Sequence, residues 1–145
     1  RIITELVAFD TTTGTTVHEY GYRFDAPPRP SPPAPGGPRP EDLALVPVDQ
    51  THVIVEERTD TEARFHTIEL DPADPLVTEA DKTLLVNLAG VAGVPGKVEG
   101  AALKNASTLV VISDNDFGFV PRAYGLDEDV DPSGVRTVLA EVKLP

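Results

Sequence analysis

The chain has 145 residues, of which 40% are hydrophobic, and it carries a formal net charge of -12. This length and hydrophobic content suit one domain with its own core. The acidic surplus argues against nucleic acid as a partner, because phosphate binding needs a basic face. Cysteine is absent, which excludes disulfides, thiol catalysis and thiolate metal sites. The sequence has no run of about 18 apolar residues, so we expect no membrane span.

Strand signals dominate the sequence, because short runs rich in Val, Ile, Thr and Leu alternate with Gly, Pro, Asp and Asn. The first two strands, residues 2–9 and 16–24, form a predicted hairpin. Residues 25–40 are half proline, which predicts an extended surface loop, since proline removes a backbone donor and fixes φ. Further strands are predicted over residues 42–48, 52–58, 63–70, 82–88, 98–103, 108–113 and 135–144, with a long acidic loop over 114–134.

An internal repeat indicates a β-propeller. Glu41-Asp-Leu-Ala-Leu45 matches Glu99-Gly-Ala-Ala-Leu103, and each copy is followed by a turn and a more apolar strand. Because these two strands are nearly continuous apolar runs, we expect them to be covered on both faces. Four strands per repeat, at a spacing of about sixty residues, are typical of propeller blades. We therefore predict an all-β fragment of one propeller domain, with about two and a half four-stranded blades over residues 1–145. Residues 1–24 form the outer strands of one blade, 25–40 a Pro-rich loop, 41–89 a complete blade, and 97–145 a closing blade without its outer strand.

The expected fragment cannot close a ring by itself. It would leave long apolar edges, which natural proteins avoid. The chain also begins at Arg1 and contains no methionine. We therefore expect the remaining blades to come from an upstream segment or a companion chain.

Four motifs in order resemble the phytase-like domain family, also named for the esterase-like activity of phytase. They are Asp42-Leu-Ala-Leu45, Val53-Ile-Val-Glu-Glu-Arg58, Lys82-Thr-Leu-Leu-Val86, and Val98-Glu-Gly-Ala-Ala-Leu103 followed by the strand that ends in Ser113-Asp-Asn-Asp-Phe117. The resemblance implies a secreted, periplasmic or cell-surface β-propeller. It also implies hydrolysis of a small-molecule phosphoester or carboxylic ester.

The first candidate site follows a predicted strand. Asp114, Asn115 and Asp116 come directly after it, and Glu99 begins the adjacent strand. Carboxylate and amide oxygens are the ligands that Ca²⁺ prefers, and a bound cation can hold a phosphate. The alternative is structural, with Asp114 and Asn115 capping a turn through side-chain to backbone hydrogen bonds.

The second candidate is the pair Glu57 and Arg58 at another strand end. A guanidinium suits bidentate recognition of an anionic substrate. The alternative is a salt bridge that ties two blades together. The leading function is therefore a calcium-assisted ester or phosphoester hydrolase. Its rival is a non-catalytic propeller that binds a partner protein or small ligand, with any calcium purely structural.

Other motifs in the sequence give weaker evidence for a functional site. Asp127-Glu-Asp-Val-Asp131 has the spacing that starts an EF-hand loop, but Pro132 occupies the position of the turn glycine, so we interpret it as a solvated acidic loop. The three histidines, His18, His52 and His66, are predicted to be surface residues of strands. No serine lies in a G-x-S-x-G context, so a nucleophile elbow is not expected.

Overall fold

The protein is described by a computed structural model that covers residues 3–25, 42–59, 62–89, 91–94, 97–115, 134 and 136–145. Within these residues the only helical element is η1, a single 3-10 turn over Glu79–Asp81. All other regular structure is strand, so the prediction of an all-β chain is confirmed. In the same ranges, no helix has the length and apolar character needed to cross a membrane.

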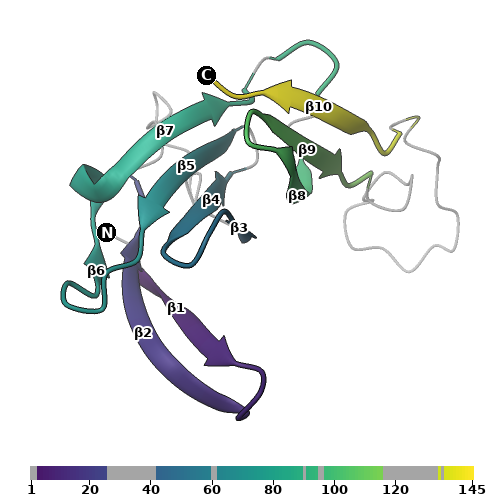
Figure 1. Ribbon diagram of the computed structural model, residues 1–145. Coiled ribbons are helices and arrows are strands. Elements are labelled where there is room, and N and C mark those ends of the chain that lie inside the picture. The colour runs from purple at the N-terminus through teal and green to yellow at the C-terminus, as the bar shows by residue number, and fades with distance from the viewer. Residues whose placement is uncertain are drawn as a thin grey trace, which may run out of the picture.

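The strands form three small sheets, none of them closed, that lie side by side in a curved row (Figure 1). The N-terminal sheet has the order β1-β2-β6, formed by Ile3–Asp10, Thr15–Arg23 and Leu76–Val77. The central sheet has the order β3-β4-β5-β7, formed by Asp42–Pro47, His52–Arg58, Ala63–Glu69 and Lys82–Asn87. The C-terminal sheet has the order β10-β9-β8, formed by Leu139–Lys143, Thr108–Ser113 and Val98–Asn105.

The segment between β5 and β7 differs from the predicted loop, because it contains β6 and η1. After β5 the chain leaves the central sheet, and β6 joins the N-terminal sheet by pairing in parallel with β2. In this pairing Gly21 lies opposite Leu76. A Cβ atom at Gly21 would approach Leu76 Cδ1 to 3.1 Å, so the glycine allows this close contact. A two-residue strand is too short to show a periodic pattern in the sequence. The last strand also begins later than predicted, at Leu139.

The central sheet is covered on both faces because successive side chains of a strand point to opposite sides. On one face, Val55 and Ile68 pack with Tyr22 of the N-terminal sheet. On the other face, Phe65 packs with Leu109 and other residues of the C-terminal sheet. Burial of each such side chain contributes roughly 1.5–3 kcal/mol. The expectation that strand 52–58 is covered on both faces is therefore confirmed.

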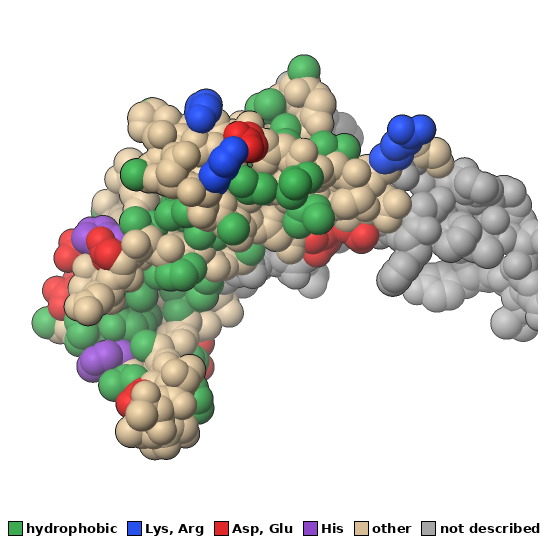
Figure 2. Space-filling view, turned by 45° about the vertical axis from the view of Figure 1, so that its right-hand side comes forward, with side chains coloured by type: hydrophobic (Ala, Val, Ile, Leu, Met, Phe, Trp, Pro, Cys, Tyr) green, Lys and Arg blue, Asp and Glu red, His purple; other side chains and the backbone are tan. Residues whose placement is uncertain are grey.

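The two outer faces of the row expose large apolar side chains, and the outer face of the C-terminal sheet also carries the Lys104–Glu141 ion pair. β1 presents Ile3, Val7 and Phe9 on the side away from the central sheet, each more than half exposed. At the other end, Leu139 and Ile112 of the C-terminal sheet are 70% and 43% exposed. Figure 2 shows hydrophobic side chains in several patches over the visible face, with acidic, basic and histidine side chains between and around them. Several large apolar side chains exposed on one face of a sheet are typical of an interface.

Candidate functional site

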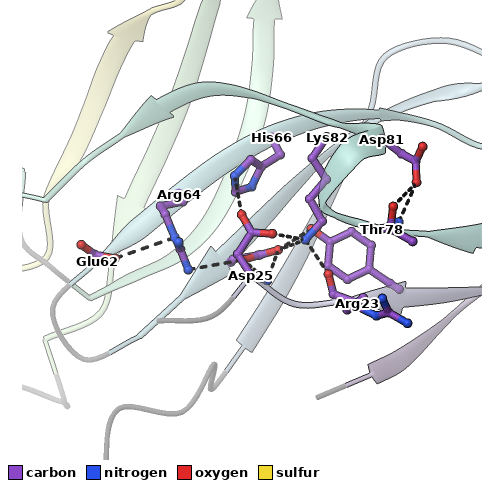
Figure 3. A network of polar contacts seen from close by, with 10 residues as sticks. Arg23, Asp25, Glu62, Arg64, His66, Thr78, Asp81 and Lys82 are labelled. Carbon is purple, nitrogen blue, oxygen red and sulfur yellow. Dashed lines mark hydrogen bonds and ion pairs between the residues drawn. The ribbon is translucent and has the colours of Figure 1, made fainter. Parts of the chain in front are cut away.

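The most concentrated polar network lies between the N-terminal and central sheets (Figure 3). Its centre is the carboxylate of Glu57, a residue that is 1% exposed. This carboxylate accepts hydrogen bonds from the Tyr22 hydroxyl at 2.7 Å and from the Asp25 backbone N–H at 3.2 Å. It also accepts from the Lys82 ammonium and, at 3.4 Å, from Arg64 Nη2. Strands from two sheets therefore meet at one buried carboxylate.

The Lys82 side chain, which is 1% exposed, reaches into this network from β7. Besides Glu57, its Nζ donates to the backbone carbonyl of Arg23 at 2.5 Å and to Asp25 Oδ1 at 2.9 Å. The same Nζ lies 4.2 Å from the centre of the Tyr22 ring, a cation–π distance. The ammonium thus joins the end of β2 to the central sheet.

His66 on β5 completes the network. Its Nε2 lies 3.4 Å from Asp25 Oδ2, and the residue is 3% exposed. The prediction of a surface histidine is therefore wrong for His66, because its strand is covered on this face by the N-terminal sheet. Burial lowers the pKa of His66 and outweighs the opposing effect of the Glu57 and Asp25 carboxylates. Burial, together with the hydrogen bond to Glu57, raises the pKa of Tyr22.

Asp25, Glu57 and His66 are residue types that bind metals, and each offers a ligand atom within 4.8 Å of the others. Within the described ranges no other group of three such residues is as close. The two carboxylates, however, are already paired with the cations of Lys82 and Arg64. A divalent ion would have to displace a buried ammonium from its own ligands. This cluster therefore does not fit a divalent metal.

The sequence-predicted residues lie on the other face of the central sheet. Arg58 follows Glu57 on β4, so it points toward the C-terminal sheet. Its Nη2 lies 3.1 Å from Glu99 Oε1 on β8, with side chains that are 5% and 38% exposed. We call this position the seam edge: the place where β4 ends at Arg58, β8 begins at Val98 and β9 ends at Ser113.

Asp114 also lies at the seam edge. Its backbone N–H donates to the Lys97 carbonyl at 2.9 Å, and its carboxylate lies 3.2 Å from Lys97 Nζ. Asn115 is half-buried beside it. Asp116 lies outside the described residues. The structure thus brings Arg58, Glu99 and Asp114 to one edge, whereas Glu57 belongs to the buried network.

Sequence reasoning missed most members of the buried network. These are Tyr22, Asp25, Arg64, His66 and Lys82. One signal was available: Glu57 continues a strand predicted to be covered on both faces, and a buried carboxylate requires partners. Nothing in the sequence indicated which residues those partners would be.

Comparison with known protein families matches residues 2–117 to the family described as phytase-like, esterase-like activity of phytase. The chain belongs to the phytase-like family. The match includes both the buried network and the seam edge, and it stops before β10. No curated protein and no solved structure matches the phytase-like chain.

We predict that Glu57→Gln lowers the free energy of unfolding by about 3–5 kcal/mol, because it removes the charge that compensates a buried ammonium. Urea unfolding followed by circular dichroism measures the change. The matched control is Glu141→Gln, which breaks the exposed pair between Glu141 and Lys104. The control should change stability little, since surface ion pairs contribute little. Equal effects of the two substitutions would contradict the assigned burial.

Acid should weaken the phytase-like chain partly through His66. Its pKa is lower in the folded chain than its ordinary 6.5, so the unfolded chain binds the proton more readily. Stability therefore falls as the pH drops below about 6.5. Thermal melting between pH 8 and pH 5 measures this loss, which His66→Gln should reduce and the exposed-site control His18→Gln should not. An identical pH dependence in wild type and His66→Gln would contradict the prediction.

Proposed function

We propose that this chain is the C-terminal part of a phytase-like β-propeller that hydrolyses a small-molecule phosphoester or carboxylic ester with the help of calcium. The observation that carries the proposal is the family match over residues 2–117, whose description names an esterase-like activity. The extracellular character of such enzymes suggests a secreted, periplasmic or cell-surface location.

The arrangement of the sheets supports the propeller. The central sheet has four antiparallel strands in sequence order, and its inner strand β3 lies against β8, the first strand of the next sheet. Large apolar side chains exposed on both outer faces are expected of a row that continues in both directions. We propose that further blades, from the same longer chain or from a companion chain, cover them.

The seam edge is the place we propose for the reaction. Glu99 and Asp114 are 38% and 37% exposed, and their oxygen atoms are of the kind that calcium prefers. The Lys97–Asp114 pair is open to solvent, with side chains that are 39% and 37% exposed, so a dissolved cation can replace Lys97 at modest cost. Arg58 is only 5% exposed, so it needs another anionic partner whenever Glu99 turns to the ion. Glu99, Asp114, Asn115 and Asp116 would hold the ion, which would supply the positive charge that an acidic edge needs to accept a phosphate.

Arg58 has a second role in this proposal. Its guanidinium is 5% exposed and is fixed at the end of β4, so little side-chain entropy is lost when it binds an anion. Exchange of its Glu99 partner for a substrate oxygen would keep its charge compensated. Glu57, predicted as a substrate ligand, points to the opposite face of β4 from Arg58. Its contacts hold β4 in place, but its carboxylate does not reach this edge.

One observation favours a different function. Arg58 and Glu99 lie 3.1 Å apart and join two sheets, which is the arrangement expected of a structural salt bridge. A non-catalytic propeller that binds a partner protein or small ligand is therefore the second candidate.

A hydrolysis assay of the complete protein separates the two functions. With calcium present we expect turnover of p-nitrophenyl phosphate or p-nitrophenyl acetate, and loss of turnover on chelation. Asp116→Ala should lower kcat/KM by at least about tenfold, the smaller end of the loss expected when a metal site is disturbed. Asp74→Ala, an exposed carboxylate in the loop at the opposite ends of the central strands, should have no effect. Absence of turnover, or turnover that survives both chelation and Asp116→Ala, would reject the calcium-assisted hydrolase. The non-catalytic binding protein would then be the remaining candidate.

Substitutions on the outer faces test the propeller. In the complete protein, Val7→Lys or Leu139→Lys would place an unpaired charge between blades and should lower Tm strongly. Thr11→Lys, in the exposed β1–β2 turn, serves as the matched control with a small effect. If Val7→Lys and Leu139→Lys change Tm no more than the control, the two faces are not covered and the propeller is wrong.

A further inference from the structure

We propose that the ammonium of Lys82 is the resident cation of the Asp25–Glu57–His66 cluster, where it takes the place of a metal ion and joins the N-terminal sheet to the central sheet. The inference is independent of the proposed hydrolysis at the seam edge. It concerns the one group of metal-ligand residue types in the described structure that lies within 4.8 Å.

The surroundings of Lys82 Nζ form a complete cation site. The ammonium has three donors, and three oxygen acceptors surround it: the Arg23 carbonyl, Asp25 Oδ1 and Glu57 Oε1. The face of the Tyr22 ring lies 4.2 Å away on a further side. Every donor of the charged group is satisfied, although the side chain is almost fully buried.

The charges leave no place for a second cation. The carboxylates of Asp25 and Glu57 face the positive groups of Lys82 and Arg64, and Glu62 lies 3.8 Å from Arg64 on its outer side. Calcium requires oxygen ligands at about 2.3–2.6 Å, a space that the ammonium already fills. A divalent ion added to this balanced cluster would carry a buried surplus of charge, which is costly. The cluster therefore excludes a metal ion for two reasons: the ammonium of Lys82 already fills the space, and the negative charge is already balanced.

The contacts also assign a structural task to Lys82. Arg23 and Asp25 lie at the end of β2 and just beyond it, Glu57 lies on β4, and Lys82 begins β7. A residue 57 positions away in the sequence thus fixes the point at which the chain leaves the N-terminal sheet. Removal of the charge leaves two buried carboxylates that repel each other, and a free cation can then relieve that repulsion.

Terbium luminescence tests this inference on the complete protein. Tb³⁺ binds at calcium-type sites and emits when a nearby tyrosine transfers energy to it, so Tyr22 reports on this cluster. In wild type, we expect no emission that depends on Tyr22, so Tyr22→Phe should leave the Tb³⁺ signal unchanged. Lys82→Ala should gain emission, and the gain should disappear in Lys82→Ala combined with Tyr22→Phe. His52→Ala, at the exposed Asp49–His52 pair of the β3–β4 turn, is the control and should gain none.

Two results would overturn the inference. One is wild-type emission that falls on Tyr22→Phe, since a metal would then share the cluster with Lys82. The other is a folded Lys82→Ala variant without new emission, since Lys82 would then not be what keeps the metal out. If Lys82→Ala does not fold, Lys82→Gln keeps more of the side-chain volume without the charge, and the wild-type comparison with Tyr22→Phe is decisive by itself. The hydrolysis assay tests the seam edge through chelation and Asp116→Ala, so failure of the Tb³⁺ test leaves the proposed hydrolysis standing.

Discussion

Adjacent residues of a β-strand point to opposite faces of their sheet, and this constraint places the two polar groups of the molecule. Glu57 and Arg58 are neighbours on β4. Glu57 is drawn into the network with the N-terminal sheet, and Arg58 pairs with Glu99 of the C-terminal sheet. Two consecutive residues therefore connect the central sheet to both of its neighbours. The same alternation divides the apolar core into two halves, with Val55 on one side and Phe65 on the other.

Burial decides what each polar group can do. Around Glu57, the charges of Glu57 and Lys82 are almost fully out of water, so they must be matched inside the protein. They match each other, and Arg64, which is 14% exposed, adds a second cation beside Glu57. At the seam edge, Glu99 and Asp114 are partly exposed, so solvent shares in their compensation. A buried and balanced cluster holds sheets together but exchanges its ions poorly. An exposed pair such as Lys97–Asp114 contributes little to stability, and its lysine can give way to a dissolved ion.

Much of the fold could be predicted from the sequence, because each main strand bears its own local signal of β-branched residues between turn residues. The order of strands in the central sheet follows from short connections, since sequential strands usually pair. β6 could not be predicted, because two residues carry no period and their partner β2 lies more than fifty positions earlier in the chain. The buried network escaped prediction for the same reason. Lys82 and Asp25 are 57 positions apart, and nothing local to either one indicates the other.

The two clusters also bear on where a phytase-like chain can bind a metal. Residue type alone would favour Asp25, Glu57 and His66, since they combine two carboxylates with an imidazole. Lys82 removes that preference because its ammonium balances the charge of the two carboxylates. A metal site needs uncompensated negative charge as well as ligand atoms. At the seam edge, the carboxylate of Asp114 is matched by Lys97, which is 39% exposed and can turn toward water, and Asp116 lies two positions further in the sequence with another carboxylate. In the proposed function, calcium would therefore bind at the partly exposed edge, and the buried cluster would keep its lysine.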